Sequence, residues 1–289
     1  MKYLLFVALF SISFLGKADE GMYLPFQLKK NKKDMKAAGL ELSTKEIYNP
    51  KKPSVKDAIV SLGGFCTGEI ISSKGLMLTN HHCGYDAIRE NATPENDILT
   101  NGFWAKNYGE EKPIPGLSVS IVVRIDDVSK SINKVLNDDM TPSQRAQAIK
   151  DISAELSAAA VSGTHYEAEV KPFYSGSEFY LFVYEVFKDV RLVGAPPSAI
   201  GKYGGNTDNW MWERHTGDFS MFRIYAGANN QPAEFAMDNK PYAPKHHLPI
   251  SLDGVEEDDF AMVMGFPGST DRFLTCLLYT SPSPRDKRQ

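Results

Sequence analysis

The chain has 289 residues, a formal net charge of −4 and 42% hydrophobic residues, so it is long enough to pack a core in one or two domains. The mild negative charge argues against a nucleic-acid-binding protein, because such proteins normally present a basic surface. Beyond the N-terminal residues no apolar stretch is long enough to cross a membrane, and we expect no membrane span.

Residues 1–18 have the pattern of a signal peptide. Lys2 gives a positive start, residues 4–15 form an apolar stretch, and Gly16 and Ala18 place small residues at the −3 and −1 positions of a cleavage site. We therefore predict cleavage after Ala18 and export of the mature chain to the periplasm or the medium. The alternative is a buried N-terminal helix.

Short strands separated by turn signals dominate the mature chain. A lysine-rich segment, 29–36, is suited to a surface helix. Strands are predicted, in chain order, over 57–62, 65–71, 76–79, 117–128, 183–193, 218–226 and 261–265. Gly63-Gly64 and the turn signal at 72–75 separate the first three, and the second and third should pair as a hairpin.

Two further segments have clear patterns. In the strand over 117–128, the apolar residues Val119, Ile121, Val123 and Ile125 alternate and should share one face. Thr141-Pro142 is typical of an N-cap and a first helical position, which predicts a helix up to about Ala160. Many short strands with one clear helix favour a β-barrel with helical insertions.

Two cysteines lie in this strand-rich region. Cys66 and Cys83 could close a disulfide loop worth about 3 kcal/mol, and an exported chain reaches a compartment where disulfides survive. The alternative is a pair of free buried thiols. Cys276 lies in the C-terminal tail and is set aside.

The segments around these cysteines resemble those of chymotrypsin-class proteases. Residues 63–68, GGFCTG, and residues 78–83, LTNHHC, match a cysteine-bearing strand that pairs through a hairpin with a strand ending in His-Cys. The resemblance implies that His82 is the catalytic base, a role suited to an imidazole with a pKa near neutrality. His81 is disfavoured, because adjacent side chains of a strand point to opposite sides. The alternative for His82 is an ordinary turn residue.

An aspartate at the start of a later strand could be the partner of His82. Residues 216–224 resemble the segment in which the orienting carboxylate of chymotrypsin-like proteases precedes an apolar strand, which implies that role for Asp218. An aspartate at a strand start is also a routine turn residue.

Longer motifs narrow the resemblance. They are GMYLP at 21–25, TNHHCG at 79–84, NTDNWMW at 206–212, RHTGDFS at 214–220 and GFPG at 265–268. In this order they resemble the dipeptidyl-peptidase 7 and dipeptidyl-peptidase 11 family over about residues 20–274. The resemblance implies a mainly β, chymotrypsin-like barrel with helical insertions, the first lobe of a double-barrel peptidase that removes dipeptides from free N-termini of peptides.

The family pattern also implies a site for the substrate's ammonium group. In the family pattern, Asn209 and Trp210 match residues that hold this amine. An amide oxygen and an aromatic face can both bind an ammonium group. The alternative is that Trp210 and Trp212 are core aromatics, which we favour for Trp212. No metal or organic cofactor is implied. The partners expected are peptides with a free N-terminus and, for the full-length protein, a second copy in a homodimer.

The chain contains neither Gly-x-Ser-Gly nor Gly-x-Ser-x-Gly, and the nearest stretch is Ser175-Gly176-Ser177-Glu178. In the family the nucleophilic serine follows in a second barrel. We therefore expect residues 19–274 to be the N-terminal part of a catalytic domain, inactive alone. Residues 275–289 depart from the family and read as a non-native tail from translated adapter sequence, with a genuine disordered tail as the alternative.

Three rival interpretations follow from the same residues. A secreted chymotrypsin-like endopeptidase would share His82 and Asp218 without an amine site, and a non-catalytic binding protein could use a protease-like barrel. A metal site would draw on the run 81–83 with His215 or with His246-His247. We do not expect this site, because known zinc spacings separate ligands by two or more residues and three consecutive ligands do not readily converge. A preference for acidic or hydrophobic substrate residues is not predicted.

Overall fold

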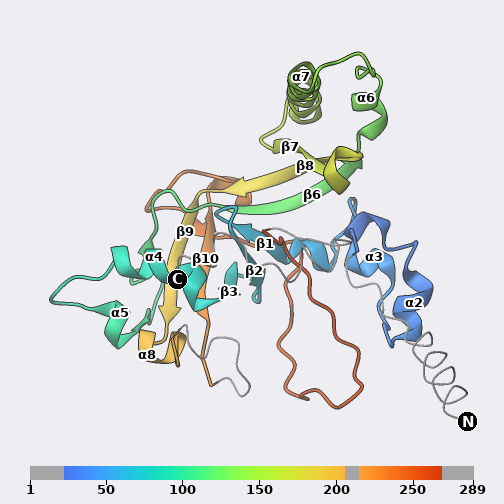
Figure 1. The fold of residues 1–289 in the computed structure, drawn as a ribbon. Coiled ribbons are helices and arrows are strands. Elements are labelled where there is room, and N and C mark those ends of the chain that lie inside the picture. Colours follow the sequence, from blue (N-terminus) through green and yellow to red (C-terminus); the bar gives the residue numbers. More distant parts are fainter. Residues whose placement is uncertain (1–22, 206–214, 269–289) are drawn as a thin grey trace, which may run out of the picture.

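The computed structural model describes residues 23–205 and 215–268 (Figure 1). The predicted signal peptide, residues 1–18, and the predicted tail, residues 275–289, lie outside the described residues. None of the described helices is both long and apolar enough to cross a membrane.

The described chain is mainly antiparallel β-structure. Its strands are β1 Ile59–Leu62, β2 Cys66–Ile70, β3 Leu76–Thr79, β4 Phe103–Trp104, β5 Lys112–Pro113, β6 Val119–Asp127, β7 Glu167–Phe173, β8 Glu178–Phe187, β9 Asp189–Ala195, β10 Ser220–Ala226 and β11 Lys240–Pro241. They form one sheet in the order β4-β9-β10-β3-β2-β1-β6-β8-β7, with β5 on β9 and β11 on β10. The sheet is open along this path, with β4 and β7 at its ends.

The predicted hairpin of β2 and β3 is confirmed, with Glu69 opposite Leu78 and Ile70 opposite Met77. The single strand predicted over 183–193 is wrong. It consists of the end of β8 and the start of β9, separated at Lys188, and the two strands pair with different neighbours. Strand β9 ends at Ala195, directly before the proline pair Pro196-Pro197.

Two other strand predictions need correction. Residues 261–265 form no strand, and Val263 there is fully exposed. The segment has the apolar composition of a strand, but it has no pairing partner in the described chain, and composition alone does not form a strand. In β6 a bulge between Val122 and Arg124 interrupts the alternation. Consequently Val119 and Ile121 join the main core, whereas Val123 and Ile125 pack in two other clusters.

The helices are short, apart from α4 and α7. They are η2 Pro25–Gln27, α2 Lys32–Ala37, α3 Thr44–Ile47, η3 Val55–Asp57, α4 His81–Glu90, α5 Ile98–Asn101, α6 Ser129–Asn133, α7 Pro142–Val161, η4 Tyr174–Gly176, α8 Ser198–Gly201 and η5 Ala228–Asn230. The prediction for α7 is confirmed: Thr141 is the N-cap, and its side chain and that of Gln144 cap each other's backbone N–H groups.

One apolar core lies inside the curved central part of the sheet. Strands β1, β2, β3, β6, β8, β9 and β10 all contribute to it, and α4 closes it with Ala87 and Ile88. Fully buried members such as Leu62, Met77 and Phe222 come from strands that are neighbours or near neighbours in the sheet. This core fixes the relative positions of β3, α4 and β10, where the candidate site lies.

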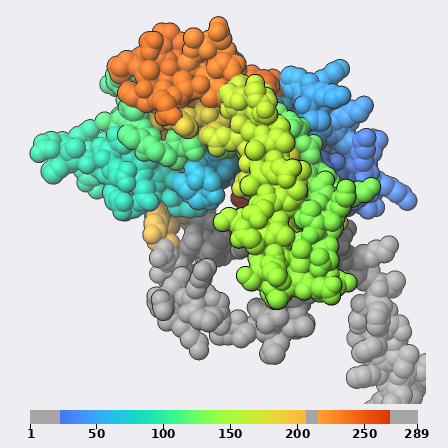
Figure 2. Space-filling model, turned by 90° about the horizontal axis from the view of Figure 1, so that it is seen from above, coloured from blue at the N-terminus to red at the C-terminus, as the bar shows by residue number. Residues whose placement is uncertain are grey.

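The far ends of β6 and β8 extend away from this core and carry β7, α6 and α7 (Figure 1). A separate cluster, including Ile132, Phe179 and Val183, holds this part together, and α7 adds Ile149, Ile152 and Leu156 to it. Viewed from above, it forms a green ridge between the blue N-terminal helices and the teal α4–α5 region (Figure 2).

Candidate active site

The two adjacent histidines lie in the first turn of a helix. Strand β3 ends at Thr79, and α4 begins at His81 after the N-cap residue Asn80. Our prediction that these histidines end a strand was therefore wrong. The side chain of Asn80 makes no capping bond to the helix. The first N–H groups of a helix have no partner within it, so another acceptor is needed here.

Asp218 is that acceptor. One carboxylate oxygen, Oδ1, accepts hydrogen bonds from the backbone N–H of His81 at 2.6 Å and of His82 at 3.3 Å. The side-chain amide of Asn80 donates to the other oxygen, Oδ2, at 3.1 Å. A carboxylate at a helix N-terminus is stabilised both by these donors and by the helix dipole. Asp218, just before β10, thus caps a helix far away in the sequence.

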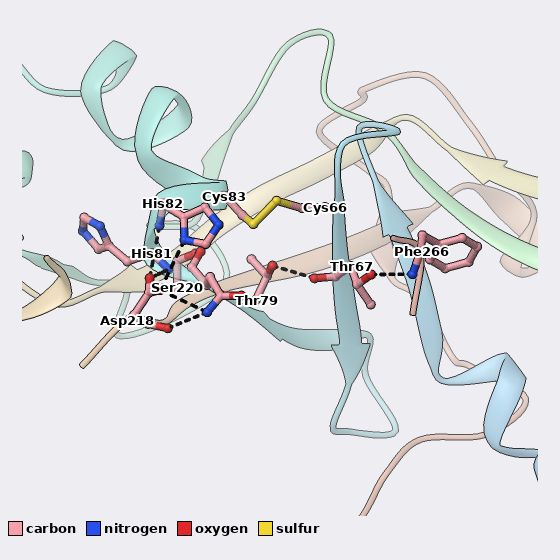
Figure 3. Close-up of a disulfide and its surroundings, with 10 residues drawn as sticks. Cys66, Thr67, Thr79, His81, His82, Cys83, Asp218, Ser220 and Phe266 are labelled. Atoms are coloured by element: carbon pink, nitrogen blue, oxygen red, sulfur yellow. Dashed lines mark hydrogen bonds and ion pairs between the residues drawn. A yellow bond between two sulfur atoms is a disulfide. The ribbon is translucent and has the colours of Figure 1, made fainter. Parts of the chain in front are cut away.

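The same carboxylate contacts the ring of His82. Its Oδ2 lies 3.2 Å from Nδ1 of His82, and the side chains are 20% and 71% exposed respectively (Figure 3). A proton on Nδ1 donated to this oxygen leaves Nε2 as the free, unprotonated nitrogen. The ring therefore has one nitrogen held by a carboxylate and another available to accept a proton. This is the geometry of a general base with an orienting partner.

A disulfide and three hydrogen bonds brace this arrangement (Figure 3). Cys83, next to His82, is bonded to Cys66 at the start of β2. The hydroxyl of Thr79 donates to the carbonyl of Thr67 at 2.7 Å, and that of Ser220 donates to the carbonyl of Asn80 at 2.9 Å. The hydroxyl of Thr67 accepts the backbone N–H of Phe266 at 2.8 Å, which ties the 265–268 motif to the same place. We call Thr79, Asn80, the first turn of α4, Cys66 and Asp218 the corner.

His81 faces the opposite way and is 1% exposed. Its ring lies against Gly201 of α8, where a Cβ would overlap it. Its Nε2 is buried with no hydrogen-bond partner. Burial lowers the pKa of this imidazole, although the negative charge of Asp218 acts in the opposite direction. His81 therefore offers its backbone N–H to the site, and its ring is a neutral packing group.

Comparisons with known proteins show which family the chain belongs to. Residues 18–279 match the family described as Peptidase S46. The chain belongs to the peptidase S46 family. It is 50% identical over 276 residues to an Asp/Glu-specific dipeptidyl-peptidase of Capnocytophaga gingivalis, covering 95% of this chain and 39% of that protein. It is 51% identical over 281 residues to dipeptidyl-peptidase 7 of Phocaeicola vulgatus, covering 94% of this chain and 39% of that protein.

A solved S46 structure is also similar. The crystal structure of Porphyromonas endodontalis DPP11 in complex with the dipeptide Arg-Asp matches with a TM-score of 0.83 and 45% identity, over 89% of this chain and 38% of that one. The resemblance stated from the sequence motifs is therefore confirmed. The chain spans about two fifths of the length of the S46 relatives that it matches.

Several residues that shape this S46 site were not found from the sequence. Asn80 and Ser220 fix the carboxylate and the backbone before α4, and Gly84 leaves room for the Ser220 hydroxyl, which a Cβ would approach to 2.6 Å. Gly201 leaves room for His81. One signal in the sequence could have indicated Ser220. It lies two positions after Asp218 at the start of a strand, and residues two apart in a strand have side chains on the same face.

Beside Asp218 an apolar surface is exposed. Trp104 of β4 is 52% exposed, lies against Gly194 of β9, and has its ring 6.0 Å from that of Phe219. Ile200 of α8 is also exposed and adjoins Gly217. This surface adjoins Gly217 and Phe219, the residues on either side of Asp218.

The other predicted site residues have different outcomes. Asn209 and Trp210, matched to the ammonium group of a substrate, lie outside the described residues, as does Trp212. The described residues do include one group with metal-ligand spacing: donor atoms of Cys66, His82 and Cys83 lie within 4.8 Å of one another. This group is not the run of three consecutive ligands, 81–83, that we did not expect to bind a metal, because it includes Cys66 and not His81. In this structure the two sulfurs are bonded to each other and are not thiolate ligands.

Proposed function

We propose that this chain supplies the base and the orienting carboxylate of a serine dipeptidyl-peptidase that releases dipeptides from the free N-termini of peptides. The observation that carries the proposal is the double use of the Asp218 carboxylate. It caps α4 at the backbone of His81 and His82 and also contacts Nδ1 of His82. The histidine backbone and its ring are therefore fixed by the same group.

The chemistry follows from this arrangement. Nε2 of His82 takes the proton of a serine hydroxyl as its oxygen attacks the carbonyl after the second substrate residue. Asp218 holds the ring in the correct tautomer and stabilises the imidazolium that forms. His82 then gives the proton to the leaving amine, which leaves a dipeptide ester on the serine. Water, activated by the same imidazole, hydrolyses this ester and restores the serine. We propose that the serine lies outside the sequence of this chain.

The names of the relatives support the substrate class. Proteins named Asp/Glu-specific dipeptidyl-peptidase and dipeptidyl-peptidase 7 match this chain equally well, at 50% and 51% identity. The proposal therefore stops at dipeptides with a free N-terminus and assigns no side-chain preference. We propose Asn209 and Trp210 as the residues that hold the ammonium group, on the motif alone.

The wider setting is also a proposal. The seven strands that share one core support a chymotrypsin-like barrel lobe, the first of two in the full-length protein. The apolar segment 4–15 and its small-residue site support export to the periplasm or the medium. Resemblance to the family supports a homodimer for the full-length protein.

A chimera tests the proposed function. Residues 19–274 are joined to the part of the Capnocytophaga gingivalis relative that follows the matching region, and dipeptide release is measured with free and N-acetylated peptides. We expect release from free peptides alone, and a loss of about 10³-fold or more in kcat with His82→Ala. The chain by itself should release no dipeptide.

The rival functions give different results in this assay. An endopeptidase would cleave free and acetylated peptides alike. A binding protein would give a folded chimera without hydrolysis. A folded chimera whose activity survives His82→Ala would contradict the proposal directly. The unmodified Capnocytophaga gingivalis protein is the control for the assay.

A further inference from the structure

The two cysteines of the disulfide and His82 bring three potential metal-ligand atoms close together in the corner. The Sγ atoms of Cys66 and Cys83 and a ring nitrogen of His82 all lie within 4.8 Å of one another. Two thiolates and one imidazole are a ligand set that zinc favours, and three protein ligands with an open fourth position occur widely for this metal. The proposed peptidase chemistry makes no use of the sulfurs.

The distances suit a zinc ion once the sulfur–sulfur bond is broken. Zinc binds thiolate sulfur at about 2.3 Å and imidazole nitrogen at about 2.0–2.1 Å, so tetrahedral ligand atoms lie roughly 3.5–4 Å apart. The three atoms already lie within 4.8 Å, and the Cα atoms of the cysteines are 6.1 Å apart. Rotation about the Cα–Cβ bond of one cysteine would separate the sulfurs without moving the backbone.

The surroundings favour metal capture by the reduced form. Cys83 is the third residue of α4, and the first turn of a helix stabilises a thiolate. The His82 side chain is 71% exposed, so its ring would have to give up a single contact, the one with Asp218, to turn toward the sulfurs. Both cysteines are partly exposed, which gives a reductant and an ion access to them. Strands β2 and β3, on which the corner rests, are also held together by their own backbone pairing.

We propose that reduction of the Cys66–Cys83 disulfide turns the corner into a Cys₂His site for Zn²⁺. A dithiol reductant is oxidised to its cyclic disulfide as the protein disulfide takes up two electrons and two protons. The two thiols then lose two protons when they bind the ion, and the neutral imidazole of His82 donates its lone pair. The complex of Zn²⁺ with two thiolates and one imidazole is neutral, which suits a partly buried position.

This site would compete with the peptidase chemistry. An imidazole bound to zinc cannot accept a proton through the bound nitrogen, and one turned toward the sulfurs has left Asp218. Zinc would therefore inactivate the reduced enzyme and leave the oxidised enzyme unaffected. This consequence rests on the proposed function, whereas metal binding by the corner does not.

Cobalt titration of this chain tests the site directly, without any activity assay. A Cys276→Ser background removes the third cysteine, and a phosphine reductant avoids thiols that compete for the metal. We expect the reduced chain to bind one Co²⁺ with thiolate-to-cobalt charge-transfer absorption, and Zn²⁺ to displace it. The oxidised chain should show no such absorption. Near-ultraviolet circular dichroism of the reduced chain, recorded before metal is added, reports whether it stays folded.

Matched variants identify the ligands. Loss of a residue that merely orients a metal ligand costs about 10–100-fold in affinity, so loss of a direct ligand in His82→Asn should weaken Co²⁺ binding by about 100-fold or more. Cys66→Ser and Cys83→Ser should abolish the charge-transfer band. His247→Asn, which removes a histidine outside this group, should bind as the parent does. Equal affinity in His82→Asn and His247→Asn would overturn the proposal, as would failure of the folded chain to bind, or unfolding on reduction.

Discussion

The corner and the segment that carries α7 are built in opposite ways. The corner joins residues 136 to 140 positions apart through hydrogen bonds to Asp218 and from Ser220. The segment from β6 to β8, with α6, α7 and β7, which we call the arm, is held by apolar contacts among residues closer in sequence. Its helix begins with its own capping residues.

This difference teaches where a single change should matter. In the corner one carboxylate has four partners, so its loss affects a helix start and an imidazole together. In the arm each contact is one of many of the same kind, and a loss should remain local and small. The following variants test this contrast.

The largest effect is expected for Asp218→Asn. An asparagine can still accept a hydrogen bond at the helix N-terminus, but it has no charge with which to stabilise the His82 imidazolium. In the chimera we expect kcat to fall by about 10⁴-fold while the fold is retained. Asp151→Asn on the exposed face of α7 is the matched control and should leave kcat unchanged. Similar kcat values for the two variants would contradict the proposed difference between corner and arm.

The disulfide should contribute the largest single share of the stability of the corner. Replacing both cysteines, Cys66→Ser with Cys83→Ser, should lower the free energy of unfolding by about 3 kcal/mol, because the unfolded chain loses a constraint. Urea unfolding measures the change, with Cys276→Ser as the control that should have little effect. If the double replacement leaves the unfolding midpoint in place, the disulfide does not brace the corner.

A smaller loss is expected at the start of α7. Thr141→Ala removes the side chain that accepts the N–H of Gln144, at a cost of about 1 kcal/mol. The amide resonances of His81 and His82 should not shift, because the arm has a cluster of its own. Shifts at those two residues in the spectrum of this variant would show that arm and corner are coupled.

A pH dependence should come from His81. Burial lowers the pKa of this imidazole in the folded chain, so at mildly acid pH the unfolded chain binds a proton that the folded chain does not. The contribution of His81 to the free energy of unfolding is therefore intact above about pH 6.5, and it is lost as the pH falls below that value. The free energy of unfolding, measured in urea, should fall less between pH 7.5 and pH 5.5 in His81→Gln than in the parent chain. An unchanged decrease would show that folding does not shift the pKa of His81.

The sequence predicted these two regions to different extents. In the arm, Thr141-Pro142 and the apolar spacing predicted α7 almost to the residue, because capping and periodicity are local. In the corner, the pairing of His82 with Asp218 came from family motifs, and its form was missed: α4 was read as a strand end. Its cap comes from Asp218, which no local pattern indicates.

The remaining errors have similar causes. The turn at Lys188 and the bulge in β6 are set by which strands pair, and pairing partners are remote in sequence. The segment 261–265 has strand composition but no neighbouring strand within the described residues. Gly84 and Gly201 matter for the space beside Ser220 and His81, which becomes visible only when the chain is folded.

The central claim is that one carboxylate holds both the start of α4 and the ring of His82. Nuclear magnetic resonance of this chain tests it through the amide protons of His81 and His82 and the Nδ1 proton of His82, compared between the parent and Asp218→Ala. We expect all three signals to move upfield and exchange faster with solvent in the variant, because each loses its acceptor. Unchanged signals at all three protons would show that Asp218 does not organise the site.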